Sequence, residues 1–242
     1  MNIVAIVQAR MGSTRLPGKV LLDLSGKPIL ERCMDRLQLA RTLDEVVIAT
    51  TIDPADDAIV DQCDKHGWSC SRGSEQDVLD RYYRAAVAHK ADIVARITSD
   101  CPLIEPKVVD RVVREFQEIQ PAIDYACNTL PMRTFPRGLD TEVFRFDVLE
   151  RAWHQDHDPA SREHVTPYVW RNPEVFHIHG IMNDVDYSHM RWTVDTEEDL
   201  AFVRRIYEHF GYDHFSWRDV LGVLKANPEW LEINRSVRQK EI

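Results

Sequence analysis

The sequence predicts an α/β protein with a doubly wound, mostly parallel sheet. Short runs of continuously apolar residues, typical of strands buried on both faces, alternate with stretches whose apolar residues recur at helical spacing. This alternation implies parallel strands joined by right-handed crossovers. A cluster of cationic, hydroxyl and glycine residues directly follows the first apolar run, at the edge where open α/β sheets bind ligands.

The alternation is clearest over residues 1–120. Apolar runs predict strands at 3–7, 46–49 and 93–97 and a short strand at 68–70, and helical spacing predicts helices over about 28–37, 54–66, 78–87 and 106–116. Asp53-Pro54 is typical of a helix start and Gly67 of a helix end. The third helix would turn six residues toward the core, which are Val78, Leu79, Tyr82, Tyr83, Ala86 and Val87. We interpret 1–120 as a nucleotide-binding half.

The rest of the chain has a different composition. Prolines, aromatic residues and most of the histidines interrupt the pattern over 121–195, which predicts a substrate-facing insertion with some antiparallel strands. Helical spacing returns at about 197–210 and 216–225 before a polar tail, so we expect 196–242 to form C-terminal helices. By length alone, 242 residues allow one large domain or two small ones. We predict a single domain.

Bulk composition argues against several classes of protein. A formal net charge of −10 argues against a nucleic-acid partner, and no stretch approaches the roughly 18 apolar residues of a membrane span. The five cysteines are odd in number and form no C-x-x-C pair, which argues against a disulfide framework and a zinc site. The N-terminus lacks a signal-peptide pattern and leads almost at once into a strand, so we expect a true start and a cytoplasmic protein.

The loop over residues 8–19 has the chemistry of a phosphate site. It reads Gln8-Ala9-Arg10-Met11-Gly12-Ser13-Thr14-Arg15-Leu16-Pro17-Gly18-Lys19. Glycines allow a phosphate to approach the backbone closely, and Arg and Lys pair with its oxygens. The loop is not a Walker loop, because five residues separate Gly12 from Gly18 and Val20 follows the lysine, and it contains no G-x-G-x-x-G. We predict a polyphosphate ligand; the simpler alternative is a solvated arginine-rich loop.

Two aspartates are expected at the same sheet edge. Asp100 follows the third long strand, and Asp195 precedes the helix predicted from 197. Mg²⁺ prefers one or two carboxylates together with phosphate oxygens and water, so Asp100 suits a metal-bound phosphate. Asp100 could instead only cap the turn before Pro102. The acids at 197–199 are explained as first-turn residues that complement the helix dipole, with a capping-box pattern over 196–199.

Three segments resemble one enzyme family. Residues 9–19 are similar to the A-R-x-x-S-T-R-L-P-G-K signature of sugar cytidylyltransferases of the CMP-KDO synthetase and acylneuraminate cytidylyltransferase type. Residues 98–104 resemble the family's G-D-x-P-L-I segment, with Ser99 replacing glycine as in the spore coat polysaccharide biosynthesis protein F group, which the chain resembles most. Residues 195–200 resemble D-T-x-E-D-L. The resemblance implies a nucleotide-diphospho-sugar transferase-like (GT-A/Rossmann-like) fold, CTP as co-substrate, and Mg²⁺ held by Asp100 and Asp195.

The resemblance also implies the residues of the nucleotide site. Catalytic roles are expected for Arg10, Lys19, Asp100 and Asp195, and nucleotide contacts for Ala9, Arg10, Gly12, Ser13, Arg15, Lys19, Arg72, Gly73, Arg96 and Ser99. Arg72 and Gly73 are assigned to a loop that enters a helix. The simpler alternative for the residues that follow is that Asp77 only caps this helix and that Asp80 and Arg81 are solvated. Arg96 could contact the base or ribose, or equally pair with a buried acid.

The acceptor side is expected in the irregular segment. Residues 128–142 resemble the F-P-x-G-L-D-x-E segment of the spore coat group, and 157–164 match a stretch that contributes to the acceptor pocket in that group. The implied acceptor-binding residues are Arg133, Arg137, Asp140, Glu142, His157, Arg162 and His164. Arginines in this set would hold a carboxylate or phosphate of an anionic small molecule.

These observations predict a Mg²⁺-dependent cytidylyltransferase. It would transfer CMP from CTP to an acidic sugar or to a phosphorylated or phosphonate acceptor, with release of pyrophosphate, for surface polysaccharide biosynthesis. A glycosyltransferase of similar sheet architecture is one alternative, but the D-x-D motif of such enzymes is missing around Asp100. A non-catalytic nucleotide-binding protein is another, but it would not need two separated carboxylates at a metal position.

Large apolar residues in the 121–195 segment predict a homodimer. The segment contains Phe135, Trp153, Tyr168, Trp170 and Phe176, which is more large apolar surface than a loop region should expose. We expect part of it to be buried against a second copy of the chain, as in the related dimeric enzymes. The alternative is an aromatic core within one chain.

Overall fold

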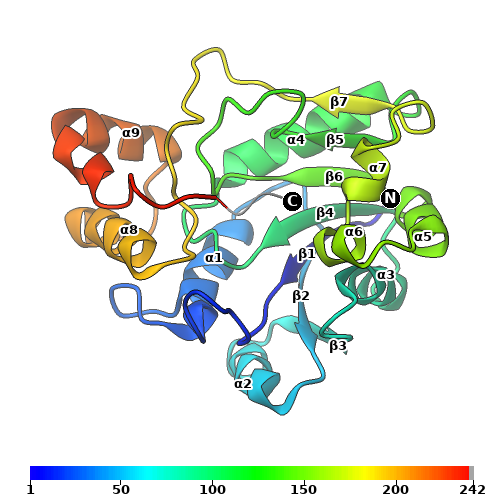
Figure 1. Ribbon diagram of the computed structural model, residues 1–242, viewed down its shortest axis with the longest axis horizontal. Helices are drawn as coiled ribbons and strands as arrows, with labels where there is room; N and C mark the ends of the chain where they lie inside the picture. The colour runs from blue at the N-terminus through cyan, green and yellow to red at the C-terminus, as the bar shows by residue number, and fades with distance from the viewer. Residues whose placement is uncertain (240–242) are drawn as a thin grey trace.

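A seven-stranded mixed sheet organises the computed structural model, which describes residues 1–239 (Figure 1). The strands are β1 (Ile3–Gln8), β2 (Glu45–Thr51), β3 (Ser69–Gly73), β4 (Ile93–Thr98), β5 (Tyr125–Cys127), β6 (Glu142–Arg145) and β7 (Ile178–Gly180). Their order is β3-β2-β1-β4-β6-β5-β7, and only β6 runs antiparallel to its neighbours. The predicted doubly wound, mostly parallel sheet is confirmed.

Strand β1 illustrates why the apolar runs become central strands. Side chains alternate between the two faces of a sheet, and here Ala5 and Val7 pack on one face while Val4 and Ile6 pack on the other. All four are fully buried, so both faces must be covered by helices. The strand order reverses between β1 and β4, where Gln8 pairs in register with Thr98. That reversal is the usual ligand crevice of an open α/β sheet.

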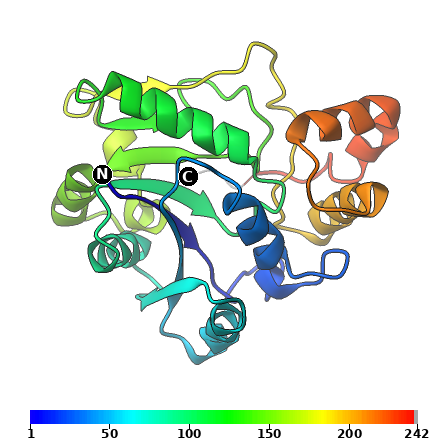
Figure 2. The same ribbon diagram turned by 180° about the vertical axis from the view of Figure 1, so that it is seen from behind.

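Helices cover both faces of the sheet (Figures 1 and 2). One face is packed by α1 (Ile29–Leu37), α2 (Asp57–His66) and α4 (Pro106–Ile119). Helices α8 (Glu197–Phe210) and α9 (Trp217–Ala226) contribute to the same core from beyond the ends of the strands. The other face is packed by α3 (Val78–Ala88), α5 (Phe146–Gln155), α6 (Pro159–His164) and α7 (Pro167–Trp170). Short 3-10 turns η1 (Lys19–Leu21), η2 (Pro54–Asp56) and η3 (Pro228–Glu232) complete the described elements.

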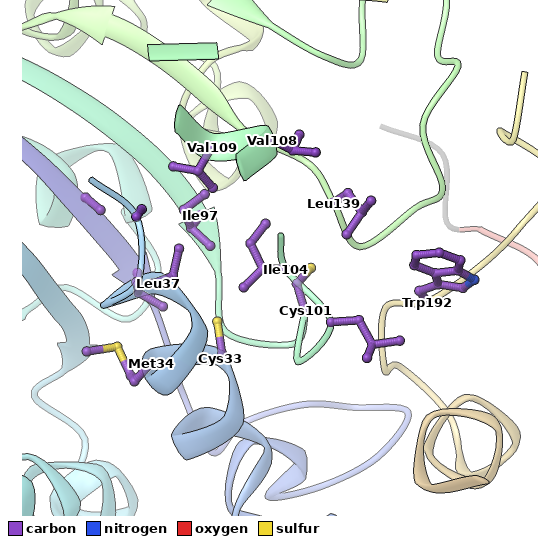
Figure 3. Packing of buried hydrophobic residues seen from close by; sticks show 14 of the residues in the cluster. Cys33, Met34, Leu37, Ile97, Cys101, Ile104, Val108, Val109, Leu139 and Trp192 are labelled. Carbon is purple, nitrogen blue, oxygen red and sulfur yellow. The ribbon is translucent and has the colours of Figure 1, made fainter. Parts of the chain in front are cut away.

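The core extends to the sheet edge that carries the predicted site. Figure 3 shows Cys101, Leu139 and Trp192 brought together from three distant parts of the chain, beside Ile97 and Ile104. All five are at most 3% exposed. Cys101 directly follows Asp100, and Trp192 lies shortly before Asp195. Their burial therefore anchors the segments that carry both aspartates.

Some expectations need correction. The short strand expected at 68–70 is β3, which continues to Gly73, so Arg72 and Gly73 lie on a strand and not in a loop. The expectation that Val87 faces the core is wrong: Val87 is 50% exposed, although Ala85 and Ala86 are fully buried, because it lies on the face of α3 that points away from the core. Across residues 1–239, no helix combines the length and apolar character required to cross a membrane.

Candidate active site

The loop after β1 is held by its own backbone and by a buried carboxylate. Gly18 has a left-handed conformation, with φ of 66°, and its N–H donates to the carbonyl of Met11 at 3.0 Å. The Met11 N–H in turn donates to Oδ1 of Asp56 at 2.6 Å. Asp56 is only 2% exposed, and it also accepts hydrogen bonds from the N–H and hydroxyl of Thr51 at the end of β2. The loop is therefore fixed to the neighbouring strand.

Lys19 connects this loop to both predicted metal ligands. Its ammonium nitrogen lies 2.6 Å from Oδ2 of Asp100 and 2.7 Å from Oδ1 of Asp195, and it donates to the carbonyl of Val194 at 2.9 Å. The lysine is only 9% exposed. Three segments that are far apart in the sequence thus converge on one cationic centre at the carboxyl edge of the sheet.

Backbone contacts align the two acidic segments. The N–H of Val194 donates to the carbonyl of Asp100 at 2.8 Å, and the Thr193 hydroxyl is 3.3 Å from the same oxygen. Asp195 follows directly and lies just before α8, whose start has the predicted capping box between Thr196 and Asp199. Asp100 is therefore more than a cap for the turn before Pro102, because its carboxylate is paired with Lys19.

Arg191 orients Asp195. Its Nη2 donates to Oδ2 of Asp195 at 2.6 Å and to Oδ2 of Asp199 at 3.0 Å, and its Nε donates to Oδ1 of Asp199 at 2.9 Å. Arg15 approaches the same Asp195 oxygen at 2.9 Å. Sequence reasoning treated Asp199 only as a helix-capping acid and did not assign Arg191. The spacing of these residues gives no signal that they form an ion pair, because the pairing depends on how the chain turns into α8.

The buried charges stabilise one another. Burial by itself would raise the pKa of Asp100, but the Lys19 ammonium lowers it, and the net pKa lies below the usual aspartate value. Burial would likewise lower the pKa of Lys19, while Asp100 and Asp195 raise it, so the net pKa lies above the usual lysine value. The Asp100 carboxylate and the Lys19 ammonium are therefore both charged at neutral pH.

The donor set suits a hard divalent cation. Asp100 and Asp195 each direct an oxygen at the point that the Lys19 ammonium occupies, which shows that the two carboxylates can hold one cation between them. Mg²⁺ is typically bound by one or two carboxylates, with phosphate and water oxygens filling the other positions. Within residues 1–239, no three His, Cys, Asp or Glu side chains group as metal ligands. Asp100 and Asp195 are the residues that would hold Mg²⁺.

Comparison with known families decides the assignment. The sequence profile described as cytidylyltransferase matches residues 4–215, a span that contains the loop, Asp100 and Asp195. The chain belongs to the cytidylyltransferase family. Membership supports nucleotidyl transfer as its chemistry and favours neither the glycosyltransferase nor the non-catalytic alternative.

Individual relatives agree with this assignment. The spore coat polysaccharide biosynthesis protein SpsF of Bacillus subtilis is 30% identical over 94% of this chain and 96% of its own length. A cytidylyltransferase structure from Leptospira borgpetersenii serovar Hardjo-bovis has a TM-score of 0.92 and 37% identity, covering 100% of this chain and 99% of that one. A CMP-KDO synthetase complexed with CTP has a TM-score of 0.67 at 20% identity, covering 86% and 99%, and shows the shared fold. The resemblance to these groups is confirmed.

In this cytidylyltransferase, Arg15 and Lys19 of the loop contact Asp195, and the side chains of Arg10 and Arg15 remain accessible. The side chains of Arg10 and Arg15 are 39% and 37% exposed. Arg10 lies 3.8 Å from Glu163 of α6, which brings α6 to the same edge. The remaining expected loop contacts are Ala9, whose N–H bonds to the Ala49 carbonyl, Ser13, whose Oγ accepts weakly from the Leu16 N–H, and Gly12. A Cβ on Gly12 would lie 3.5 Å from Glu75.

Arg72 and Gly73 brace the end of β3. Arg72 donates to the carbonyls of Thr51 and Asp53 and pairs with Asp57 at 2.6 Å, so its guanidinium already has protein partners. Gly73 packs against Arg81, to whose Cγ an added Cβ would come within 3.2 Å. The expectation that Arg81 could be solvated is wrong. Arg81 is 2% exposed, because α3 lays it under the end of β3.

Arg96 is paired with a buried acid, which is the second of the two roles considered for it. Arg96 pairs with Glu142 across the antiparallel β4–β6 ladder and also donates to Oε1 of Gln8 at 3.2 Å. Glu142 in turn accepts from the Tyr125 hydroxyl at 3.0 Å and the Thr166 hydroxyl at 2.6 Å. Burial would lower the pKa of Arg96, but Glu142 raises it above the usual value. Ser99, which follows β4, is buried, and its N–H donates to the Gln8 carbonyl at 3.2 Å.

The two arginines of the 133–140 segment differ in whether a carboxylate of the protein pairs with their charge. Arg133 forms a two-pronged pair with Asp140, so its charge is compensated. Arg137 makes no side-chain hydrogen bond or ion pair with any residue in 1–239, and it lines a cavity of about 350 Å³ together with Arg191. Burial and then the neighbouring Arg133 lower the pKa of Arg137. The Arg137 N–H donates to the Met190 carbonyl at 3.0 Å and the Trp192 N–H donates to the Arg137 carbonyl at 2.7 Å, which places Arg137 beside the segment that leads to Asp195.

The remaining acceptor-side residues surround α6. Arg162 is held by Oδ2 of Asp77, at 2.8 Å, and by the carbonyls of Trp153 and Asp156. His157 is exposed in the turn before α6, and His164 is half-buried at its end. Arg162 therefore joins α6 to Asp77 at the start of α3, and Glu163 is the residue of α6 that reaches the loop after β1.

Proposed function

We propose that this protein transfers CMP from CTP to an anionic acceptor, with Mg²⁺ as the metal and pyrophosphate as the second product. A hydroxyl or acid oxygen of the acceptor forms a new bond to the α-phosphorus, and the bond from that phosphorus to pyrophosphate breaks. The observation that carries the proposal is the convergence of Lys19, Asp100 and Asp195 at the switch point of the sheet. Family membership supports the nucleotidyl transfer, and the CTP complex of a fold neighbour supports the choice of CTP.

Each residue of the site has a proposed task. Arg10, Ser13, Arg15 and Lys19 would hold the triphosphate and neutralise the charge that develops on the leaving pyrophosphate. Asp100 and Asp195 would hold Mg²⁺, which when bound supplies positive charge to phosphate oxygens and can lower the pKa of the attacking group. Catalysis would then come mainly from positioning and from preorganised charge.

The acceptor is proposed to be an acidic sugar, or a phosphorylated or phosphonate acid. Arg137 supports an anionic acceptor, because its guanidinium has no protein partner in 1–239 and lies beside a cavity next to Arg191. The name of the B. subtilis relative supports a role in surface polysaccharide biosynthesis. Cytoplasmic location stays a prediction.

A turnover screen tests this function. Purified protein with CTP, MgCl₂ and a panel of acidic sugars and phosphorylated acids should release pyrophosphate, and CTP should bind more tightly than ATP or GTP in calorimetric titration. Release of a free nucleotide from a sugar nucleotide would favour glycosyl transfer instead. Binding of CTP that is independent of magnesium, with no turnover for any acceptor, would favour a nucleotide sensor.

We also propose a homodimer formed through the 121–195 segment. Two of the five aromatic residues, Phe135 and Phe176, are buried within the chain, in agreement with the alternative of an internal aromatic core. Apolar surface nevertheless remains in the segment, since Met132, Met182 and Val185 are 61%, 46% and 53% exposed. The N–H of Asn183 bonds to the Thr134 hydroxyl at 2.7 Å, so the two loops carrying these residues lie together.

A further inference from the structure

The ammonium group of Lys19 is fully satisfied by the protein. An ammonium has three N–H donors, and Lys19 makes three short hydrogen bonds, to Asp100, Asp195 and the Val194 carbonyl, at 2.6, 2.7 and 2.9 Å. None of its donors is left for a phosphate. At the same time, the ammonium occupies the point on which the two carboxylates converge. A phosphate-binding role for Lys19 and a metal-binding role for the aspartates therefore both require Lys19 to move.

We propose that the Lys19 ammonium acts as a resident cation that prevents a divalent metal from binding to the nucleotide-free site. A nucleoside triphosphate would displace this ammonium and so allow the metal to bind. Triphosphate binding would then precede or accompany metal binding and could not follow it. This inference rests on the proposed function, because it takes Asp100 and Asp195 to be the metal ligands.

Charge balance supports this order. The cluster contains three cations, Lys19, Arg15 and Arg191, and three carboxylates, Asp100, Asp195 and Asp199, so it is neutral as it stands. A divalent cation that entered without nucleotide would add two positive charges to a partly buried site. It would also have to displace an ammonium that has no other partner within the site. Losing one member of a buried ion pair is strongly unfavourable.

A triphosphate removes both obstacles to metal binding, the excess positive charge and the loss of partners for the displaced Lys19 ammonium. It brings negative charge that compensates the metal, and it offers oxygen acceptors to the displaced ammonium. Lysine suits this exchange because it is a point charge on a flexible four-carbon stem. Lys19 is also the first residue of η1, directly after Gly18, so it lies at the end of the loop that is expected to bind the phosphates.

Metal binding by the nucleotide-free protein tests the proposal. Mn²⁺ binding, followed by electron paramagnetic resonance, should be weak for the wild-type chain without nucleotide. Lys19→Met should bind Mn²⁺ about tenfold more tightly or better, since the competing cation is gone. Lys225→Met, which removes one exposed lysine from α9, controls for the change in net charge and should bind Mn²⁺ like the wild type. Adding Asp195→Asn to Lys19→Met should abolish the gain.

Lys19→Gln provides a second variant in case Lys19→Met does not fold, and it should show the same gain in Mn²⁺ affinity. Wild-type protein should also bind CTP in the presence of EDTA. Equal Mn²⁺ affinities of the folded Lys19 variants and the wild type would overturn the proposal, and so would CTP binding that strictly requires metal. Absence of turnover with every acceptor, together with the expected Mn²⁺ gain, would count against the proposed reaction and leave the role of Lys19 intact.

Discussion

Single side chains determine the electrostatics of the candidate site. The Lys19 ammonium donates hydrogen bonds to both Asp100 and Asp195, and Arg191 donates to the other carboxylate oxygen of Asp195. Each of these groups is stabilised by its charged neighbours and would be costly to bury alone. Substitutions that keep the shape of a side chain but change its charge are therefore the most informative tests at this scale.

The aspartates can be tested one at a time. Asp100→Asn and Asp195→Asn should each lower turnover on the order of 10²-fold or more, comparable with the loss of one preorganised electrostatic group. The folded state should persist, because the amide keeps one oxygen acceptor for the Lys19 ammonium. Pyrophosphate release measures the loss, and circular dichroism confirms folding. Near wild-type turnover in a folded variant would remove that residue from the mechanism.

The Asp100–Lys19 pair also predicts a pH dependence of stability. The pKa of Asp100 is lowered in the folded chain, so its contribution to the free energy of unfolding is present above the unfolded aspartate pKa of about 3.9 and is lost as pH falls through the lower folded value. The pKa of Lys19 is raised, so its contribution is complete below about 10.4 and is lost only as pH rises through the higher folded value.

Urea unfolding of wild type and Asp100→Asn measures this dependence. The difference between their free energies of unfolding should stay constant between about pH 5 and 9 and shrink below about pH 4. Thr193→Val, a neighbour without a titrating group, should show no such change at low pH. A difference that varies strongly between pH 6 and 8 would contradict the assigned directions of the pKa shifts.

Secondary-structure elements position these side chains through a few buried connections. The 136–139 segment runs beside 190–193, where the Trp192 N–H donates to the Arg137 carbonyl and the Arg137 N–H donates to the Met190 carbonyl. Gly138 lies so close that an added Cβ would be 2.7 Å from the Thr193 backbone nitrogen. Asp56 makes a similar connection between β2 and the loop after β1. Such connections fix the relative positions of elements that are distant in sequence, and through them the positions of the side chains of the site.

Asp56 gives a prediction at the element scale. Asp56→Ala should weaken CTP binding, because the Met11 N–H loses its acceptor and the loop is no longer tied to β2. It should also lower the free energy of unfolding by about 1–3 kcal/mol, the cost of leaving buried donors unpaired. Calorimetry with CTP and urea unfolding measure the two effects.

Asp53→Ala is the matched control. Asp53 caps η2 through the Ala55 N–H at 2.7 Å and makes no contact with the loop, so its removal should cost about 1 kcal/mol of stability with CTP affinity unchanged. If Asp56→Ala bound CTP as tightly as the wild type, Asp56 would have no role in positioning the loop.

At the scale of the whole molecule, the charge distribution and the remaining apolar surface are the informative features. The chain carries a formal net charge of −10, yet the loop after β1 presents Arg10 and Arg15 at an accessible edge. An anionic ligand is therefore repelled by the molecule in general and attracted at one place. The exposed Met132, Met182 and Val185 form the second feature, in the segment proposed to pair with another copy.

Light scattering at micromolar concentration tests the dimer. We expect a mass of twice the 28.1 kDa chain. Met132→Lys combined with Met182→Lys should shift the mass toward one chain, since charged residues disfavour burial in an apolar interface, while Leu39→Lys, at an exposed residue of another surface, should leave it unchanged. A fully active wild-type protein with the mass of one chain would exclude the dimer.

The sequence by itself determined the strands and helices of residues 1–120, the helices after residue 196, the doubly wound sheet and the chemistry of the 8–19 loop. These features are local: an apolar run, a helical period, an Asp-Pro start or a Gly end depends on residues close together in the chain. Local patterns also placed Asp100 and Asp195 at the ends of elements that meet at one sheet edge.

Only the tertiary structure decided which charged groups pair. Lys19 bridges Asp100 and Asp195, Arg96 is committed to Glu142, Arg81 is buried under β3, and Asp56 holds the loop. Nothing in the local sequence distinguishes these side chains from solvated ones. Their pairing depends on strand order and register, which bring together residues far apart in the chain, and on burial, which makes each charge require a partner.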